Sequence, residues 1–167
     1  LPVTISQGNE YRLSATLDPQ LQIGAGLTDT DDWITLGFSS DDSIDLPFQE
    51  QSSAFGTVLL WDRRTDNGDL QVFPGSGTSG AQDFTPPGTG PLEFTIELDA
   101  TAASSGDWTV SFSIGNTSLA SDESISGDPS TISYIGFTRF EGMGGTVSDI
   151  QLEVVPEPSV AAFVLGG

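Results

Sequence analysis

Residues 92–98 read LEFTIEL, and this stretch decides the class of fold. Four apolar side chains alternate there with three polar ones, namely Leu92, Phe94, Ile96 and Leu98 with Glu93, Thr95 and Glu97. Successive side chains of a β-strand point to opposite faces, so a period of two indicates a strand with one face buried and one face in water. The stretch therefore predicts an antiparallel sheet, in which such half-buried strands are common.

The rest of the chain repeats this signal. The same alternation is found at residues 11–17, 108–114 and 146–155. Further segments of strand composition are residues 33–38 (WITLGF), 57–61 (TVLLW), 70–73 and 132–138, with residues 3–7 as an expected edge strand. Since TVLLW is apolar on both faces, we expect it inside a sandwich. No segment shows the period of an amphipathic helix, so the sequence predicts about nine strands and an all-β fold.

Turn signals separate these segments. Residues 66–69 read DNGD, and Asn-Gly is the strongest short hairpin signal, so the strands on either side of it are expected to pair. Asp18-Pro19 is expected to end the first strand because proline has no amide hydrogen for a ladder. Residues 74–91 and 116–130 are rich in turn-forming residues and are expected to be loops. Short strands at this spacing predict an antiparallel two-sheet β-sandwich or jelly roll.

The composition excludes several kinds of chemistry. The 167 residues include no cysteine and no histidine, so no Ser-His-Asp or Cys-His arrangement can be built from this chain. Asp and Glu number 24 against 4 Lys and Arg, which gives a net charge of −20. Because such a surface repels phosphate backbones, we expect no nucleic-acid partner.

The end of the chain carries a recognisable motif. Residues 155–159 read VPEPS and precede the apolar run VAAFVL at 160–165. The motif resembles the PEP-CTERM sorting signal of exported bacterial proteins, in which V-P-E-P precedes a membrane-spanning helix. The resemblance implies processing by an exosortase system and delivery to the cell surface or extracellular matrix. The expected organisation is a sandwich domain over residues 1–155 and a Pro-Glu-Pro spacer with an apolar tail over residues 156–167.

Four segments of the body carry a second resemblance. They are WITLGF (33–38), DWTVSF (107–112), YIGF (134–137) and GTVSDIQL (145–152). Together they resemble a concanavalin A-like, or laminin-G-like, jelly roll. In such domains W-x-V-x-F lies in the middle of a sheet and a final D-x-x-L strand closes it.

Glu93 and Glu97 invite comparison with laminarinase-type glycoside hydrolases, which share this fold and have the signature E-x-D-x-E. Thr95 stands here in place of the central aspartate. Residues four apart on a strand are about 13 Å apart, whereas a retaining pair needs carboxyl groups about 5–5.5 Å apart. We therefore expect both glutamates on a polar outer face, and we predict no catalytic residue and no enzyme activity.

Aspartates flank the strand expected at residues 33–38 and form a candidate metal site. They are Asp29, Asp31, Asp32, Asp41, Asp42 and Asp45. Carboxylates converging from two loops suit the six to eight oxygen ligands of Ca²⁺, although the spacing does not match an EF-hand loop. The alternative is a set of solvated, turn-forming aspartates. Ca²⁺ is thus the one cofactor that the sequence suggests.

Two further kinds of site are candidates. An exposed indole beside a carboxylate is a common platform for a sugar ring, which makes Trp33, Trp61 and Asp62 candidate glycan-binding residues. Burial of the indoles in a core or an interface is the alternative. Trp108 shares a face with its apolar neighbours and is expected in the core. Asn116-Thr117-Ser118 is an N-x-[ST] sequon, so Asn116 is a candidate glycosylation site.

The apolar tail leads to the main functional hypothesis. Its candidate assembly residues are Val160, Ala161, Phe163, Val164 and Leu165. An apolar strand of this length can add to the sheet edge of a neighbouring copy, and a head-to-tail contact that does not close makes a fibre. We therefore expect a non-enzymatic extracellular structural protein, a subunit of a cell-surface filament or matrix whose partners are other copies of itself. The alternative is a lectin-like carbohydrate-binding module, with or without Ca²⁺, whose partner is an extracellular polysaccharide.

Overall fold

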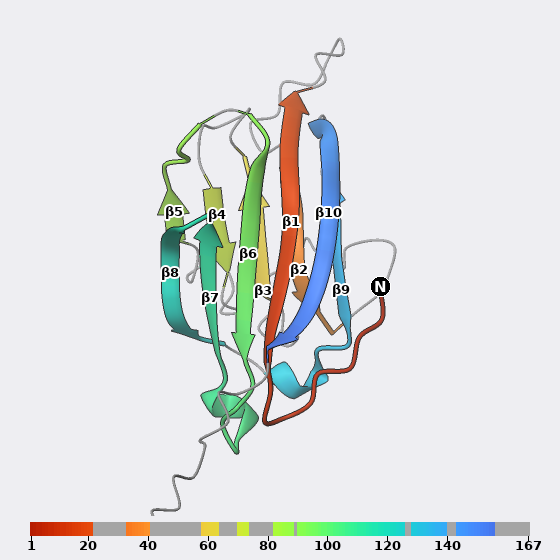
Figure 1. The fold of residues 1–167 in the computed structure, drawn as a ribbon, viewed down its shortest axis with the longest axis vertical. Coiled ribbons are helices and arrows are strands. Elements are labelled where there is room, and N and C mark those ends of the chain that lie inside the picture. The colour runs from red at the N-terminus through yellow and green to blue at the C-terminus, as the bar shows by residue number, and fades with distance from the viewer. Residues whose placement is uncertain are drawn as a thin grey trace, which may run out of the picture.

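The computed structural model describes residues 1–21, 33–40, 58–63, 70–73, 82–88, 90–125, 128–139 and 143–155. Within these ranges the chain forms ten β-strands and two short 3₁₀ turns, with no α-helix. The strands make two antiparallel five-stranded sheets that pack face to face (Figure 1). The prediction of an all-β, two-sheet jelly roll is therefore confirmed. No helix in the described ranges has the length and apolar character needed to cross a membrane.

Five strands make each sheet. Sheet I contains β1 (Glu10–Leu21), β6 (Leu92–Asp99), β7 (Thr109–Ile114), β8 (Thr117–Ser124) and β10 (Met143–Val155). Sheet II contains β2 (Ile34–Ser39), β3 (Val58–Asp62), β4 (Leu70–Phe73), β5 (Gln82–Phe84) and β9 (Tyr134–Arg139). The strand order is β10-β1-β6-β7-β8 in sheet I and β5-β4-β3-β2-β9 in sheet II. Strand β10 therefore forms one edge of sheet I, and β9 forms one edge of sheet II.

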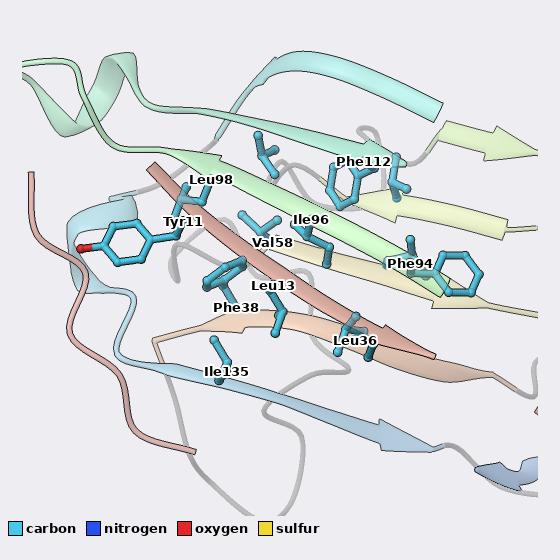
Figure 2. Close-up of a cluster of buried hydrophobic side chains, with 14 of the residues drawn as sticks. Tyr11, Leu13, Leu36, Phe38, Val58, Phe94, Ile96, Leu98, Phe112 and Ile135 are labelled. Atoms are coloured by element: carbon cyan, nitrogen blue, oxygen red, sulfur yellow. The ribbon is translucent and has the colours of Figure 1, made fainter. Parts of the chain in front are cut away.

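The core lies between the two sheets and follows the two-residue period of the sequence. In β6, Phe94, Ile96 and Leu98 are buried while the residues between them remain partly exposed. Pairing on both sides of β1 aligns Leu13 with Leu152 of β10 and with Ile96 of β6. Figure 2 shows side chains of both sheets meeting in this layer, with Leu13 and Ile96 from sheet I and Leu36 from sheet II. Trp108 is buried in the same cluster, as predicted.

Sheet II differs from sheet I because its central strands β2 and β3 are buried on both faces. All six residues of β2 are buried, and so are four of the five residues of β3. This agrees with the prediction that the doubly apolar segment 57–61 lies inside the protein. The face away from the core carries Leu59 and Phe73, which pack with the partly buried Trp61 as a small second cluster.

Three boundaries differ from the sequence predictions. Strand β1 does not end at Asp18-Pro19, because β10 continues to pair with it there and Pro19 is aligned with Gly145. The pairing of β1 with β6 stops at Leu17. At Pro19, therefore, no hydrogen bond to β6 requires the amide hydrogen that proline lacks. The expected loop 74–91 contains β5, and the expected loop 116–130 contains β8.

Strand β8 was missed because its hairpin and its bulge hide the pattern. Gly115 and Asn116 form a two-residue turn, with Gly115 at a φ of +51°. The register then shifts opposite Ser111, where Asp122 has a φ of +55° and donates its N–H to the Ser111 hydroxyl at 3.0 Å. A bulge of this kind interrupts alternation, so the period of two is lost in the sequence.

The edge strand β9 is covered along only part of its length. Pro2 forms an isolated bridge with Tyr134, and Ile135 exchanges hydrogen bonds with Leu1 through its N–H at 2.9 Å and its carbonyl at 2.7 Å. The Val3 N–H bonds to the Ser133 carbonyl at 2.8 Å. The expected edge strand at residues 3–7 does not form, and Leu1, Pro2 and Val3 make these contacts with β9 and Ser133 instead. No described residue pairs with the free edge of β9 beyond Ile135.

Asp128 ties together the two 3₁₀ turns, η2 (Ser105–Asp107) and η3 (Pro129–Thr131). Its carboxylate accepts hydrogen bonds from the Ser130 hydroxyl at 2.6 Å, the Ser130 N–H at 3.0 Å and the Ser105 hydroxyl at 3.1 Å. These hydrogen bonds, the Ser130 hydroxyl first, hold the pKa of Asp128 below its ordinary value.

The core predicts a large effect of truncating a buried aromatic side chain. Phe112→Ala is expected to lower the free energy of unfolding by about 3–5 kcal/mol, because it removes buried area and leaves a cavity between the sheets. The matched control is Ser113→Ala, the next residue on the outer face of β7, with an expected change within about 0.5 kcal/mol. Urea unfolding followed by circular dichroism measures both, and equal losses would contradict the assignment of the two faces.

The cap at Asp128 predicts a pH-dependent effect. A carboxylate with a lowered folded-state pKa stabilises the fold above its ordinary pKa of about 3.9, and this contribution is lost as the pH falls through the lower value. Asp128→Ala should therefore lower the thermal midpoint slightly at neutral pH, and the difference from the wild type should shrink in acid. Thermal scans of both proteins across the acidic range test this, and a difference that grows in acid would contradict it.

Candidate functional site

The described residues form a pocket at the side of the sandwich, where the edges of the two sheets meet. We call it the rim pocket; its volume is about 300 Å³ and its lining residues are Ile34, Phe137, Thr138, Arg139, Gly145 and Val147. The residues come from β2 and β9 of sheet II and from β10 of sheet I. In Figure 1 the strands β9 and β10 lie one behind the other at this side of the molecule.

Strand register explains why these side chains gather there. Arg139 lies opposite Ile34 and Phe137 lies opposite Leu36, and directly opposed residues of an antiparallel pair project to the same side. Ile34 and Leu36 belong to the core, so Phe137 and Arg139 point to the core side of sheet II. Because β9 is an edge strand, this side opens to solvent and Phe137 is 50% exposed. The Phe137 ring is thus half exposed at the mouth of the pocket.

The wall from β10 depends on a glycine. Gly145 has a φ of +105°, a conformation that other residues rarely adopt. A β-carbon at this position would collide with the backbone carbonyl of Asp18 on the adjacent strand β1. Gly145 therefore lets β10 lie close against β1 while Val147, opposite Leu17, turns its side chain inward.

The backbone of β9 adds hydrogen-bonding groups beside the pocket. The N–H and carbonyl of Ile135 point away from β2, since both bond to Leu1. By the two-residue period of a strand, the N–H and carbonyl of Phe137 and Arg139 point the same way. No described residue pairs with them. Two donors and two acceptors are therefore available along the edge next to the exposed ring.

Arg139 is the charged group of this site. It is exposed, and among the described residues it has no ion pair or hydrogen bond. Arg12 offers a contrast, because its guanidinium lies 2.8 Å from the Glu97 carboxylate on the outer face of sheet I. The hydrogen bond to Glu97 is the main cause of a raised Arg12 pKa, and Glu153 and Glu10 add smaller contributions. Arg63 is buried.

The predicted glycan platform is arranged differently from the expectation. Trp33 is buried and stacks on the half-buried Trp61, with ring centroids 4.4 Å apart and an angle of 10° between the planes. Phe73 packs on Trp61 as well, at 4.5 Å and 57°. Asp62 is fully buried and lies opposite Ile34, which places it on the core side of β3, away from both indoles. Trp33 and Trp61 are adjacent, but they stack on each other, and Trp61 also packs on Phe73. The Asp62 carboxylate lies on the opposite face of the sheet.

Two polar atoms in this region are left without partners. The Thr35 hydroxyl and the Trp61 indole N–H are buried, have no hydrogen bond, and belong to directly opposed residues of β2 and β3. Each such group costs about 1–3 kcal/mol when desolvated. With the rings stacked and these atoms buried, the rim pocket is the more accessible candidate.

Several other predicted sites can be placed only in part. Asp29, Asp31, Asp32, Asp41, Asp42 and Asp45 lie outside the described residues, so the Ca²⁺ site stays a prediction. Within the described ranges, no group of three or more acidic side chains is arranged to hold a metal ion. Asn116 is exposed in the hairpin between β7 and β8, and its glycosylation also stays a prediction. The assembly residues Val160, Ala161, Phe163, Val164 and Leu165 lie outside the described residues.

The glutamates that invited the comparison with hydrolases lie on the outer face of sheet I. Glu93 is exposed and is aligned with Thr16, whereas Glu97 is aligned with Arg12, to which it is bonded. The Glu97 carboxylate is therefore already engaged in an ion pair with Arg12. Neither glutamate lines the rim pocket.

Comparisons with known proteins give a distant likeness of fold. No family model matches the chain, and no curated protein matches it. Among solved structures, the alginate lyase Aly36B has 16% identity and a TM-score of 0.43, with 92% of this chain and 70% of that chain covered. A double mutant of the same lyase in complex with an alginate trisaccharide has 14% identity and a TM-score of 0.41, with 87% of this chain covered. The chain spans 63% of the length of that second structure.

These comparisons correct two expectations. The chain was expected to be a subunit of a homopolymeric filament or matrix, but both similar solved structures are of an alginate lyase. The expectation of no enzyme activity is contradicted by the same finding. Both expectations were based on the apolar tail, the lack of histidine and the altered glutamate signature. These sequence features do not show how residues are arranged in a binding site.

Sequence reasoning missed the rim pocket. Phe137 and Arg139 were read only as part of the strand at 132–138 and its end. The available signal was their phase, because Phe137 and Arg139 lie two and four residues after the inward-facing Ile135 and so share its face of the strand. An aromatic residue and an arginine at core-facing positions indicate a strand that runs out of the core at a sheet edge.

Proposed function

We propose that this protein is a carbohydrate-binding β-sandwich and that the rim pocket holds a sugar unit of an extracellular polysaccharide. The observation that carries the proposal is the exposed ring of Phe137 beside an unpaired strand edge. Sugar rings present apolar CH groups on one face and hydroxyl groups around their rim. An aromatic ring with hydrogen-bonding groups at its side is complementary to both features.

The size and lining of the pocket support this proposal. A volume of about 300 Å³ is at the lower end of the range for ligand sites and suits one or two sugar units. Ile34 and Val147 supply apolar walls, and the Thr138 side of the pocket is polar. The outward N–H and carbonyl groups of Phe137 and Arg139 can donate to and accept from hydroxyl groups, as polar groups do in orienting a ligand within an apolar site.

We further propose that the protein is exported and reaches the cell surface or extracellular matrix. The support is the VPEPS motif, which begins at Val155, the last residue of β10. The described strands therefore end where the motif begins, and processing after Val155 would leave them intact. A surface location would place the rim pocket among extracellular polysaccharides.

The proposed site predicts a selective loss of binding. Phe137→Ala is expected to weaken binding of the best-bound oligosaccharide about three- to tenfold, because it removes the stacking surface. The measurement is a glycan array of neutral and acidic oligosaccharides, followed by titration calorimetry with the strongest binder. The matched control is Val154→Ala, which truncates an equally exposed apolar side chain at 54% exposure on β10, outside the pocket.

Two outcomes would contradict the site. One is that the wild-type protein binds no saccharide on the array. The other is that both variants lose affinity equally, which would indicate a general effect on the sheet edges. Circular dichroism of both variants confirms that the fold is retained, and this is expected because both side chains are about half exposed.

The export proposal has a separate test. The full-length protein is expressed in a host with an exosortase system, and a variant with VPEPS replaced by five alanines serves as the comparison. Fractionation and mass spectrometry should find the wild type at the cell surface or in the medium, shortened at its C-terminal end, and the variant retained uncleaved. The same location and the same C-terminus for both proteins would overturn this proposal.

A further inference from the structure

We infer that the saccharide held in the rim pocket carries a carboxylate, as a uronic acid does, and that Arg139 pairs with it. This inference rests on the proposed function and goes further by naming the chemical class of the ligand. It starts from the charge of Arg139, which pairs with no acidic side chain among the described residues.

This protein has few arginines. Among the described residues, the arginines other than Arg139 are either paired with a carboxylate or buried. The chain has 24 acidic residues against 4 arginines and lysines. Arg12 is bonded to Glu97, and Arg63 is buried. With so many carboxylates available, an arginine with no acidic partner among the described residues is unexpected unless its guanidinium serves a ligand.

The spacing of Arg139 from Phe137 fits an acidic sugar. Both residues point to the same side of β9, two positions apart, which corresponds to about 7 Å along a strand. This distance leaves room for the exocyclic carboxylate of a stacked pyranose ring and for one hydrogen bond of about 3 Å between it and the guanidinium. A planar guanidinium can bind both oxygens of that carboxylate, a geometry that an uncharged hydroxymethyl group cannot use.

The apolar walls strengthen the pairing, while the net charge opposes it. Ile34, Phe137 and Val147 line the same pocket and exclude part of the water that would weaken an exposed ion pair. The charge of −20 repels a long polyanion, and this repulsion is screened within about 8 Å at physiological salt. We therefore expect a modest preference, about five- to tenfold, that is best measured with short oligosaccharides at physiological ionic strength.

The test uses matched pairs of tetrasaccharides of the gluco, manno and galacto series. The members of a pair share one linkage and differ only in having a hydroxymethyl group or a carboxylate at C6. The wild type should bind the acidic member of at least one pair about five- to tenfold more tightly by titration calorimetry. Arg139→Gln should bind both members of that pair equally, and Arg139→Lys should keep part of the preference.

Arg12→Gln is the matched control. It also removes one positive charge, but from the outer face of sheet I, away from the residues of β10 that line the pocket. The Arg12→Gln variant should therefore keep the full preference for the acidic saccharide. If saccharides bind but the wild type shows no preference, or Arg139→Gln keeps it, the inference is wrong and the proposed function stands. If Arg12→Gln loses the preference equally, net charge rather than contact is responsible, and the inference is also wrong. If no member of any pair binds, both the inference and the proposed function fail.

Discussion

The fold depends on the apolar layer between the two sheets, and the other features follow from how that layer ends. Alternation buries one face of the central strands β1, β6 and β7 of sheet I, and Leu13 and Ile96 lie in the layer that they form. At the side where β9 and β10 form the sheet edges, the layer reaches solvent, because no further strand continues either sheet in the described ranges. Phe137 lies at this boundary, with its side chain on the core side of sheet II and half exposed to solvent. The rim pocket is thus a product of the sandwich itself and needs no additional element.

The sequence was a good guide wherever the period of two is unbroken. The strands at residues 92–98 and 108–114 were predicted within a residue or two, because each keeps its apolar side chains on one face. Prediction failed where local chemistry disturbs that period. The bulge at Asp122 hid β8, and Pro19 was read as a strand end although only β10 pairs with β1 at that point.

The candidate site was harder to predict than the fold, for a physical reason. Strand composition shows which side chains face inward, but it does not show which strands become edges. Phe137 has the same phase as Ile135, yet one is half exposed and the other is buried. Asp62 shows the converse, since a carboxylate that follows a tryptophan was read as part of a surface platform and lies in the interior. The N-terminal residues bond to β9 at Ile135 and no described residue pairs with that edge beyond it, a difference that the period of the strand does not show.

The stacked indoles have a consequence for spectroscopy. Trp33 and Trp61 lie nearly parallel at 4.4 Å, on the face of sheet II that points away from the central layer, whereas Trp108 is buried in that layer with its N–H bonded to the Ala102 carbonyl. Closely stacked chromophores couple their electronic transitions, and an isolated one does not. The coupled signal therefore reports on sheet II, and the emission of Trp108 reports on the space between the sheets, so the order in which these two regions form during refolding can be followed without an added label.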